Sequence, residues 1–449
     1  MRLDDWLARA AEGVPGQTAV VAGDRRLTFA ELDREAVAAA RRLSGMGVAR
    51  GDHVALTAEP SLDYAVLLHG MAKLGAVAAP LDPRATEPEL EALLERLEPR
   101  LVVLDPCDVL ESSEVAGELP EDAFEIDAPH CVIHTSGTSG PPKPVTLTYG
   151  NHLWNAVGSG VRIGVSPADR WLCCLPLHHI GGFAILVRGA VYRIAVELQP
   201  FDVDAVAAAM ADHGVTIVSL VPTMLSRLLD AEAPLERLRC ALLGGGPLPA
   251  PLLERALAAG VPVAPTYGLT ECASQVATMP PGEVHLRPGS AGPPILTTEV
   301  RIDDEGLICV RGPSVAAGET GPDGWLRTRD LGRLDDEGYL YVLGRTDDVI
   351  VTGGKKVTPD EVEEVLLAHP GVADAAVHSR EDPDWQQAVI ATVVPADGVD
   401  VDEAELRAFC RERLAPHKVP KDFSFVAEIP RNSHGKVLRA ALSREARRD

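Results

Sequence analysis

The sequence predicts an α/β protein with a large N-terminal domain of two α/β subdomains plus a small β subdomain, followed by a small α+β C-terminal domain. Apolar strand-like runs alternate with helical runs over residues 53–134 and again over residues 203–264, which is typical of βαβ units around a mostly parallel sheet. Between residues 281 and 344 the apolar runs become short and are split by glycine, aspartate and proline. From about residue 345 a unit of about 100 residues begins, which is large enough to fold by itself.

The first alternating block begins with a helix start signal. Thr28 and Glu31 have the spacing of a capping box, in which both side chains satisfy backbone N–H groups at the start of a helix. Ser61 is a candidate N-cap for the next helix. The predicted helices span residues 28–47, 62–74 and 86–97, and the predicted strands span 53–57, 76–80, 101–104 and 131–134. The last of these strands ends where open α/β sheets usually bind ligands.

The second block and the C-terminal domain are predicted from the same kinds of signal. The predicted helices are 203–213, 223–229, 251–259, 358–369 and 403–414, and the predicted strands are 215–219, 240–243, 262–264, 299–302, 306–311, 373–378 and 388–394. Thr358 and Glu361 again have capping-box spacing, and Pro359 occupies the first helical position. We therefore expect a helix to begin at this point.

Composition and charge exclude several classes of function. With 42 basic and 66 acidic residues, the formal net charge is −24, which disfavours broad contact with nucleic acid or an anionic membrane. The eight cysteines lie mostly in apolar runs and form no CxxC pair, which favours reduced thiols in a cytosolic protein. No run reaches the ~18 apolar residues of a membrane span. We expect a soluble, cytoplasmic protein that gathers its few cations where it binds anions.

The stretch after residue 134 has the composition of a phosphate cradle. It contains Thr135, Ser136, Gly137, Thr138, Ser139, Gly140, Pro141, Pro142 and Lys143. The glycines let backbone N–H groups approach an anion, the hydroxyl groups add donors, and the lysine adds a mobile charge. The spacing is not that of a Walker A loop, so a different nucleotide loop is indicated. Taken alone, the same residues also fit an ordinary turn.

Four further stretches accompany this loop. They are residues 242–247 (LLGGGP), 267–271 (YGLTE), 328–330 (TRD) and 344–354 (GRTDDVIVTGG). With Gly435 and Lys436 near the C-terminal end, their order and spacing resemble the core motifs of the acyl-adenylate-forming, AMP-binding enzymes. That superfamily includes acyl- and aryl-CoA ligases, firefly luciferase and peptide-synthetase adenylation domains. The resemblance covers essentially the whole chain and implies an enzyme in which a carboxylate attacks the α-phosphate of ATP.

The resemblance assigns roles in nucleotide binding. Residues 135–143 hold the β- and γ-phosphates, Thr270 contacts the α-phosphate, and Glu271 binds Mg²⁺, which favours a carboxylate together with phosphate oxygens. The implied adenine and ribose ligands are Gly244, Gly245, Gly246, Pro247, Tyr267, Asp330 and Arg345. Because two anions meet in this reaction, the site needs hydrogen-bond donors and a cation but no general base.

The resemblance also implies a mobile C-terminal domain. The predicted domains are residues 1–346 and residues 347–449. Asp347 matches the hinge position, and Lys436 matches the lysine that bridges carboxylate and phosphate during adenylation. A lysine in a basic tail is also commonly just solvated. Gly353 and Gly354 match the backbone of a pantetheine channel, where a side chain would block the thiol, but the pair equally fits a type I′ hairpin turn.

Within the superfamily, the chain most resembles the 2-succinylbenzoate-CoA ligases of menaquinone synthesis. The matching stretches are 176–182 (PLHHIGG), 215–224 (VTIVSLVPTM), 242–247, 267–274 (YGLTECAS) and 289–292 (GSAG). Their acid has an aliphatic carboxylate, which is activated, and an aromatic carboxylate, which must be recognised. Arg188 lies in an apolar run, where a lone arginine is costly unless paired. We predict that Arg188 and Ser274 bind the aromatic carboxylate and that His179 lies beside the aliphatic one. Arg188 could equally snorkel to the surface or pair with a nearby acid.

Rival functions share most of these motifs. Another aryl- or acyl-CoA ligase would differ in its acid, and a stand-alone adenylation enzyme that loads a carrier protein would differ in its thiol acceptor. A non-catalytic homologue is expected to lose Lys143, Glu271 or Lys436, and all three are present. Lys355 and Lys356 depart from the family pattern and could contact the phosphates of CoA. The expected ligands are a small carboxylic acid, ATP, Mg²⁺ and CoA, and the sequence allows a homodimer.

Overall fold

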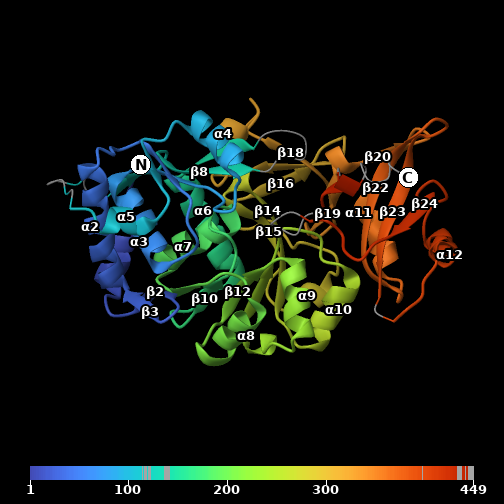
Figure 1. The fold of residues 1–449 in the computed structure, drawn as a ribbon, viewed down its shortest axis with the longest axis horizontal. Helices are drawn as coiled ribbons and strands as arrows, with labels where there is room; N and C mark the ends of the chain where they lie inside the picture. The colour runs from blue at the N-terminus through green and yellow to red at the C-terminus, as the bar shows by residue number, and fades with distance from the viewer. Residues whose placement is uncertain are drawn as a thin grey trace.

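The computed structural model describes residues 1–113, 115, 119, 123–135, 142–396, 398–431, 437–439, 441 and 442. The chain runs from the N-terminal elements at one end of the molecule to the C-terminal elements at the other (Figure 1). The large N-terminal part holds two α/β layers and a small antiparallel sheet, and the C-terminal part is a separate α+β unit. The predicted fold class is confirmed.

The first sheet has five strands in the order β6-β4-β5-β8-β9. Its strands are β4 (His53–Leu56), β5 (Val77–Pro80), β6 (Leu101–Val103), β8 (Pro129–Thr135) and β9 (Lys143–Thr148). β8 and β9 are antiparallel, whereas the other pairs are parallel. The accompanying helices are α2 (Phe29–Gly45), α3 (Leu62–Leu74), α4 (Glu87–Leu97) and α5 (Pro106–Leu110). The capping box predicted at Thr28 forms, and Ser61 caps α3.

The second sheet has eight strands in the order β15-β14-β13-β12-β10-β11-β2-β3. Its strands are β2 (Thr18–Ala22), β3 (Arg25–Thr28), β10 (Arg170–Cys173), β11 (Ala195–Leu198), β12 (Ile217–Leu220), β13 (Cys240–Leu243), β14 (Val263–Leu269) and β15 (Ser274–Thr278). The helices of this part are α1 (Trp6–Gly13), α6 (Tyr149–Ile163), α7 (Ile180–Tyr192), α8 (Val203–Asp212), α9 (Pro222–Asp230) and α10 (Ala250–Ala258). The hairpins β2–β3 and β14–β15 close the two edges with antiparallel pairs. One hydrophobic core joins both large sheets through α2, α3 and α7.

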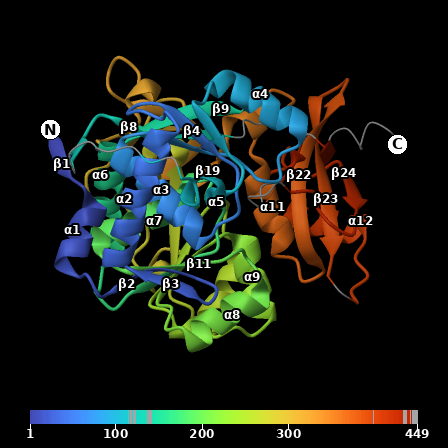
Figure 2. The ribbon, with the colours of Figure 1, turned by 60° about the vertical axis from the view of Figure 1, so that its left-hand side comes forward.

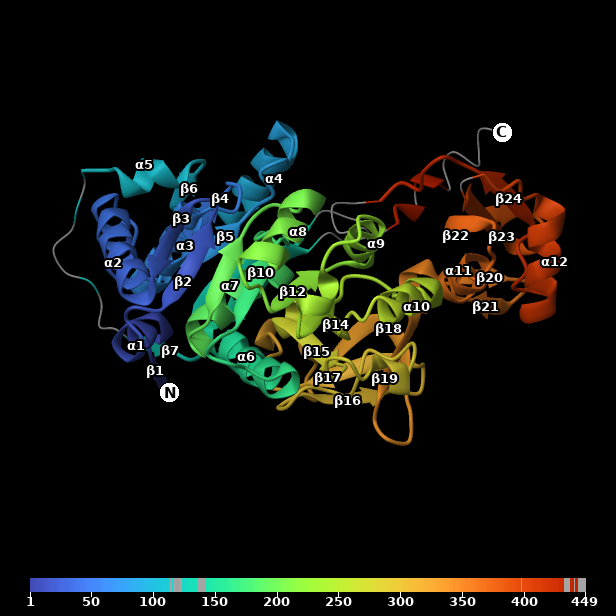
Figure 3. The ribbon, with the colours of Figure 1, turned by 90° about the horizontal axis from the view of Figure 1, so that it is seen from below.

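Two small antiparallel sheets complete the N-terminal part. The strands β1 (Arg2–Asp4) and β7 (Ala123–Glu125) form one of them. The other contains β16 (Glu299–Ile302), β17 (Leu307–Arg311), β18 (Leu326–Leu334) and β19 (Leu340–Arg345) in sequence order. This β subdomain, predicted from residues 281–344, lies below the second sheet in Figure 3 and has its own small core.

The C-terminal unit packs around a core of its own. Its strands are β20 (Ile350–Thr352), β21 (Lys355–Val357), β22 (Val372–Asp382), β23 (Gln386–Pro395) and β24 (Asp422–Phe425), and its helices are α11 (Pro359–Leu367) and α12 (Glu403–Arg413). It lies at one side of the molecule in every view (Figure 2). The capping box predicted at Thr358 is wrong. The helix begins there, but Thr358 makes no side-chain cap, and Glu361 instead lies 2.5 Å from Lys418 Nζ.

The cysteines and the helix lengths agree with the composition. All eight cysteines are free thiols, and all are buried except Cys107, which is half-buried. Within the described part of the chain, no helix is both long enough and apolar enough to cross a membrane.

Candidate functional site

The predicted phosphate loop joins two antiparallel strands of the first sheet. Thr135 is the last residue of β8 and Lys143 the first residue of β9, and the two are register partners. The Thr135 hydroxyl donates a hydrogen bond to the Lys143 carbonyl over 3.2 Å, which closes the base of the loop. The remaining predicted members, Ser136, Gly137, Thr138, Ser139 and Gly140, lie outside the described residues.

The Lys143 ammonium contacts a carboxylate that no sequence motif indicated. Its Nζ lies 2.5 Å from Oε2 of Glu319, which ends the short turn η4 (Ala317–Glu319). The lysine side chain is 62% exposed and the glutamate side chain 14% exposed. An exposed cation therefore reaches into the site toward a largely buried anion. The fold alone brings Glu319 to this loop, because its neighbours in sequence follow no recognisable pattern.

One hairpin carries four of the predicted site residues. They are Tyr267 in β14, Thr270 and Glu271 in the turn η2 (Thr270–Cys272), and Ser274 at the start of β15. The register pairs Leu269 with Ser274. The residues predicted to contact the nucleotide and the residue predicted to contact the acid therefore lie close together on one hairpin.

The backbone of this hairpin is tightly constrained. A Cβ at Gly268 would lie 2.0 Å from the Ser274 carbonyl oxygen, so only glycine fits. Ala273 and Ser274 have φ values of 55° and 114°. Side chains rarely adopt these conformations, which cost about 1–3 kcal/mol each and cluster at functional sites. The strain points to a site that requires this particular turn.

Burial raises the pKa of the Glu271 carboxyl, and the neighbouring acids Glu319 and Asp330 raise it further, whereas Lys143 opposes them. The Glu271 carbonyl accepts a hydrogen bond from the Ala316 N–H over 2.8 Å, which ties η2 to the segment before η4. A desolvated carboxylate next to a phosphate loop is a suitable partner for Mg²⁺, so these residues fit the predicted metal.

The predicted ribose ligands form a continuous polar network. The Tyr267 hydroxyl donates to Asp330 Oδ2 over 2.6 Å, and burial followed by the Asp330 charge raises the pKa of that phenol. Arg345 Nη1 lies 3.4 Å from Asp330 Oδ1, and Arg345 Nη2 lies 3.7 Å from Asp347 Oδ2. Asp330 and Arg345 are register partners on β18 and β19. The network therefore runs from the end of β14 to the predicted hinge.

The predicted adenine loop follows β13. The Gly244 N–H donates to the Leu220 carbonyl over 3.1 Å, and Gly245 has a φ of 82°. A Cβ at Gly245 would lie 3.0 Å from a methyl group of Val221. Gly246 and Pro247 complete the turn into α10. Since β13 pairs with β14, this loop lies beside the strand that carries Tyr267.

The two histidines of the predicted acid site lie at the start of α7. His179 is the residue before the helix, and its ring meets the His178 ring edge-on, with the centroids 4.0 Å apart. His178 Nε2 lies 3.5 Å from Asp82 Oδ2, although burial lowers the pKa of this imidazole. His178 thus turns toward the first sheet, and His179 occupies the helix end from which Arg188 is nine residues away.

Arg188 is a buried guanidinium whose neighbours are neutral. It is 2% exposed, its Nη2 donates to Asn155 Oδ1 over 2.7 Å, and its carbon Cζ lies 5.6 Å from the centre of the Trp171 ring. Its Nε has no hydrogen-bond partner among the described residues, and none of their carboxylates forms an ion pair with it. The side chain therefore does not reach the surface, and within the described residues it has no acidic partner.

Asn155 connects Arg188 to the hairpin. Its Nδ2 donates to the carbonyls of Cys272 and Gln275 over 2.9 and 2.8 Å, and these two residues flank Ser274. The side-chain amide of Gln275 is 1% exposed and has no partner among the residues that the structure describes. Neither Asn155 nor Gln275 was predicted, because a polar residue inside an amphipathic pattern carries no signal of its partner.

The glycine pair forms the tip of a two-residue hairpin between β20 and β21. Thr352 and Lys355 are register partners, and Gly353 and Gly354 have φ values of 55° and 74°. A type I′ turn requires positive φ at both positions, so the turn by itself accounts for both glycines. A Cβ at Gly353 would also lie 2.7 Å from the Trp385 ring. Lys436 lies outside the described residues.

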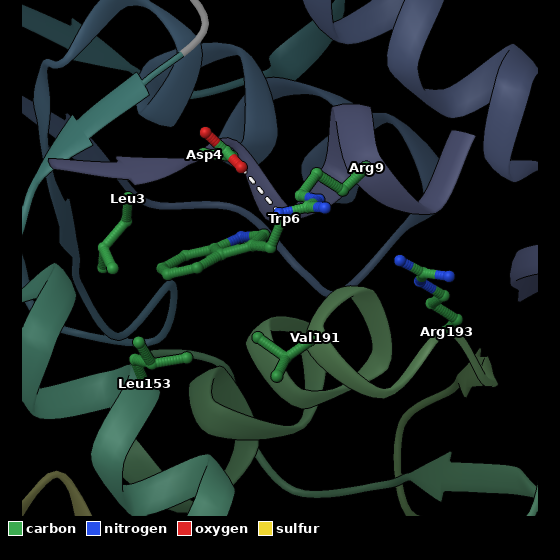
Figure 4. Close-up of a pocket in the computed structure, with 7 residues that line it drawn as sticks. All are labelled: Leu3, Asp4, Trp6, Arg9, Leu153, Val191 and Arg193. Carbon is green, nitrogen blue, oxygen red and sulfur yellow. Dashed lines mark hydrogen bonds and ion pairs between the residues drawn. The ribbon is translucent and has the colours of Figure 1, made fainter. Parts of the chain in front are cut away.

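A surface pocket of about 310 Å³ lies elsewhere (Figure 4). Its lining comprises Leu3, Asp4, Trp6, Arg9, Leu153, Val191 and Arg193. Arg9 and Asp4 neutralise each other across 2.6 Å. None of the predicted site residues lines this pocket, so it is separate from the site assembled above.

Comparison with known proteins decides the family. The sequence profile of the AMP-binding enzymes matches residues 7–318, and that of the C-terminal domain of the same enzymes matches residues 361–436. The chain belongs to the AMP-binding enzyme family. The predicted family, fold class and enzyme class, an AMP-forming acid–thiol ligase, are confirmed.

Similar AMP-binding enzymes are known from bacilli. The chain is 39% identical to a 2-succinylbenzoate–CoA ligase of Bacillus cereus, with 98% of each chain covered. It is 35% identical to the o-succinylbenzoate CoA synthetase of Bacillus subtilis, whose complex with the acyl-adenylate intermediate OSB-AMP superposes with a TM-score of 0.90 over 98% of both chains. The complex of that enzyme with ATP and a magnesium ion gives 0.90, covering 98% of this chain and 100% of the other. A double mutant with a product analogue, OSB-NCoA, gives 0.73 at 98% coverage of both chains.

Proposed function

We propose that this AMP-binding enzyme is an ATP-dependent ligase that joins 2-succinylbenzoate to CoA in menaquinone biosynthesis. In the first step the aliphatic carboxylate and ATP give an acyl-adenylate and pyrophosphate. In the second step the CoA thiol displaces AMP and a thioester forms. The observation that carries the choice of acid is Arg188, a buried cation whose charge no described carboxylate balances.

A second carboxylate on the substrate would balance that charge. Burying an unpaired ion is expensive, so a buried guanidinium without an internal anion favours an anionic ligand. Asn155 bonds both Arg188 and the backbone on either side of Ser274. We assign the aromatic carboxylate to Arg188 and Ser274, directly or through water, with His179 beside the aliphatic carboxylate. A monocarboxylic fatty acid leaves this cation unpaired, which argues against a fatty-acid ligase.

The first step requires charge control and no general base. A carboxylate at neutral pH is already ionised, and the attack on the α-phosphate releases pyrophosphate, so the site must bring two anions together. Lys143 and the loop that starts at Thr135 would hold the β- and γ-phosphates, which requires the Lys143 ammonium to leave Glu319. Thr270 would contact the α-phosphate and Glu271 would hold Mg²⁺, which supplies charge neutralisation when bound. Lys436 is proposed to bridge carboxylate and phosphate.

The nucleoside would occupy the cleft between two strand ends. Asp330 would accept hydrogen bonds from the ribose hydroxyls, and its carboxylate is held by the Tyr267 hydroxyl and by Arg345. Tyr267 offers a ring face to the adenine, and Gly244, Gly245, Gly246 and Pro247 offer backbone on the other side.

The second step would use a different arrangement of the two domains. We propose that the chain divides between residues 346 and 347, with Asp347 as the hinge. Gly353 and Gly354 would then line the channel of the pantetheine thiol. A Cβ at Gly354 meets no atom within 4 Å in the present arrangement, so a side chain there would act only after rotation. ATP and CoA are substrates and Mg²⁺ is the cofactor. A cytoplasmic location and a homodimer remain predictions from the sequence.

Pyrophosphate release tests the function directly. The protein with Mg-ATP is given 2-succinylbenzoate, benzoate, a medium-chain fatty acid or an amino acid, each with and without CoA. We expect pyrophosphate release and thioester formation with 2-succinylbenzoate alone. Preference for another acid would overturn the Arg188 assignment, and transfer to a phosphopantetheinyl carrier protein but not to CoA would favour a carrier-loading enzyme.

A further inference from the structure

Two adjacent aspartates in the link between the domains are held from opposite sides. The link is the turn η5 (Thr346–Asp348). Asp347 Oδ2 accepts a hydrogen bond from Arg329 Nη1 over 3.1 Å and lies 3.7 Å from Arg345 Nη2. Asp348 Oδ2 lies 3.5 Å from Nη1 of Arg439 in the C-terminal unit. Asp347 is therefore paired with arginines of the N-terminal part, whereas Asp348 is paired with an arginine of the C-terminal unit.

Arg329 contacts the link with both its side chain and its backbone. Its side chain is 66% exposed, and it precedes Asp330, the proposed ribose ligand, on β18. Its carbonyl accepts a hydrogen bond from the Thr346 hydroxyl over 3.1 Å, so both its backbone and its side chain contact the link. We name Arg329, Arg345 and Asp347 the hinge clasp.

In this structure the contacts of the hinge clasp are formed, and the arrangement of the two domains resembles one of two known arrangements. The two complexes of the Bacillus subtilis enzyme that bracket the reaction have the same identity to this chain, 35%, and the same coverage, 98%. Yet the TM-score is 0.90 for the acyl-adenylate complex and 0.73 for the complex with the product analogue. The clasp thus coexists with the arrangement of the first half-reaction.

We propose that Arg329 is a positioning residue that, through Asp347, holds the C-terminal domain in the arrangement for adenylate formation. The inference rests on the proposed function only for the assignment of each arrangement to a step. A half-exposed ion pair is weak, which suits a contact that must open in every turnover. Its loss is expected to change the ratio of the two arrangements about threefold and to leave the fold intact.

Distance measurement tests the hinge clasp without any substrate. Spin labels at residues 304 and 399, which are both exposed, report the separation of the two domains, with Cys107→Ser to remove the half-buried thiol. Arg329→Gln is expected to enlarge a second distance population about threefold, and Arg329→Lys, which keeps the charge, to restore most of the original distribution. Arg333→Gln, on the same strand with its guanidinium over the Tyr341 ring, is the matched control. An Arg329→Gln distribution equal to that of Arg333→Gln would overturn the proposal.

The half-reactions give a second readout. Arg329→Gln is expected to slow acyl-adenylate formation about threefold while thioester formation from supplied acyl-adenylate stays unchanged or rises. Added salt should reduce this difference between wild type and variant, because an exposed ion pair is screened. Equal slowing of both half-reactions would count against the clasp. If no acid supports pyrophosphate release but the distances shift as expected, the proposed function fails and the clasp stands.

Discussion

Arg188 and Arg439 are both largely buried, and they differ in what balances their charge. Arg188 in α7 is surrounded by neutral groups, and burial lowers the pKa of its guanidinium. Arg439 follows the bridge between Arg431 and Val437. Its Nη2 lies 2.7 Å from Glu363 Oε1 and 3.0 Å from Asp360 Oδ1, and its Nη1 lies 3.5 Å from Asp348 Oδ2.

We propose that this difference separates a structural cation, Arg439, from a cation that binds substrate, Arg188. Arg439 joins its own segment to α11 and to the turn η5, and it also donates to the Val377 carbonyl over 3.0 Å. Its carboxylates raise its pKa against the effect of burial. Among the described residues, Arg188 contacts neutral groups and no carboxylate pairs with it, so we expect its desolvation to be compensated only when an anion binds. Removing each arginine should therefore affect different properties.

The largest effect is expected for Arg188→Met on catalysis. We expect kcat/KM for 2-succinylbenzoate to fall about a hundredfold, equivalent to ~3 kcal/mol, because a buried charge pair with the substrate is lost. The free energy of unfolding without substrate should stay equal or rise, since an unpaired buried charge is removed. Steady-state kinetics and urea unfolding measure the two. The matched substrate is 4-oxo-4-phenylbutanoate, which lacks the aromatic carboxylate and should react equally with both proteins. A loss of stability without a loss of selectivity would mean that Arg188 is structural.

Arg439→Met should show the reverse pattern. It leaves the carboxylates of Glu363 and Asp360 facing each other without their cation, and we expect the unfolding free energy of the C-terminal unit to fall by about 2.5 kcal/mol. Urea unfolding monitored in this unit provides the measurement. Arg413→Met, which removes a surface pair with Glu412, is the control and should change stability by less than about 1 kcal/mol. Equal effects of the two variants would remove the distinction drawn here.

The Arg439 cluster should also give stability a pH dependence. Burial raises the pKa of Glu363 to about 7, and Arg439 opposes this shift. Between pH 4.5 and 7 the folded state then binds the proton more tightly than the unfolded state, so stability falls as pH rises across this window and is level above it. We expect a change of about 3 kcal/mol, from ~1.4 kcal/mol for each pH unit of the window. Unfolding at a series of pH values measures it, and Glu363→Gln should flatten the profile. A level profile across the same window would show that Glu363 is ionised throughout.

Arg188→Lys should give the smallest effect and separates charge from geometry. Lysine keeps the cation but loses the planar fork that reaches Asn155, so we expect a fall in kcat/KM of about tenfold, or ~1.4 kcal/mol. The measured quantity is the ratio of kcat/KM between the Arg188→Lys and Arg188→Met variants. A lysine variant as poor as the methionine variant would show that orientation, rather than charge, determines recognition.

Local signals predicted most of the elements and the motif loops. The capping box at Thr28 and the N-cap at Ser61 depend on residues within one helical turn, and both form. The box at Thr358 fails because its glutamate pairs with Lys418, 57 residues away. Long-range pairing of this kind leaves no periodic signal. The same holds for β2 and β3, which join the second sheet from the first 28 residues of the chain.

The candidate site follows the same division. Thr270 and Glu271 were predicted as site residues because they belong to one contiguous sequence motif. Glu319, Asn155 and Arg329 were not, since each acquires its partner only when separate elements pack. Arg188 was predicted because burying an unpaired arginine in an apolar run costs free energy. The structure adds that the side chain is buried and that its Nε has no hydrogen-bond partner among the described residues.

The hairpin of β14 and β15 has a consequence for the evolution of new substrates. Its turn holds the proposed phosphate contacts and the proposed acid contact Ser274 within a few residues, and Gly268 permits no side chain because of the Ser274 carbonyl. A substitution that widens the pocket from this side must also move the groups that position ATP. If the proposed site is correct, variation in the acid is less costly from the α7 side, because residues 179 and 188 can change without moving this hairpin. We therefore expect enzymes selected for a new acid to differ in sequence mainly in that helix.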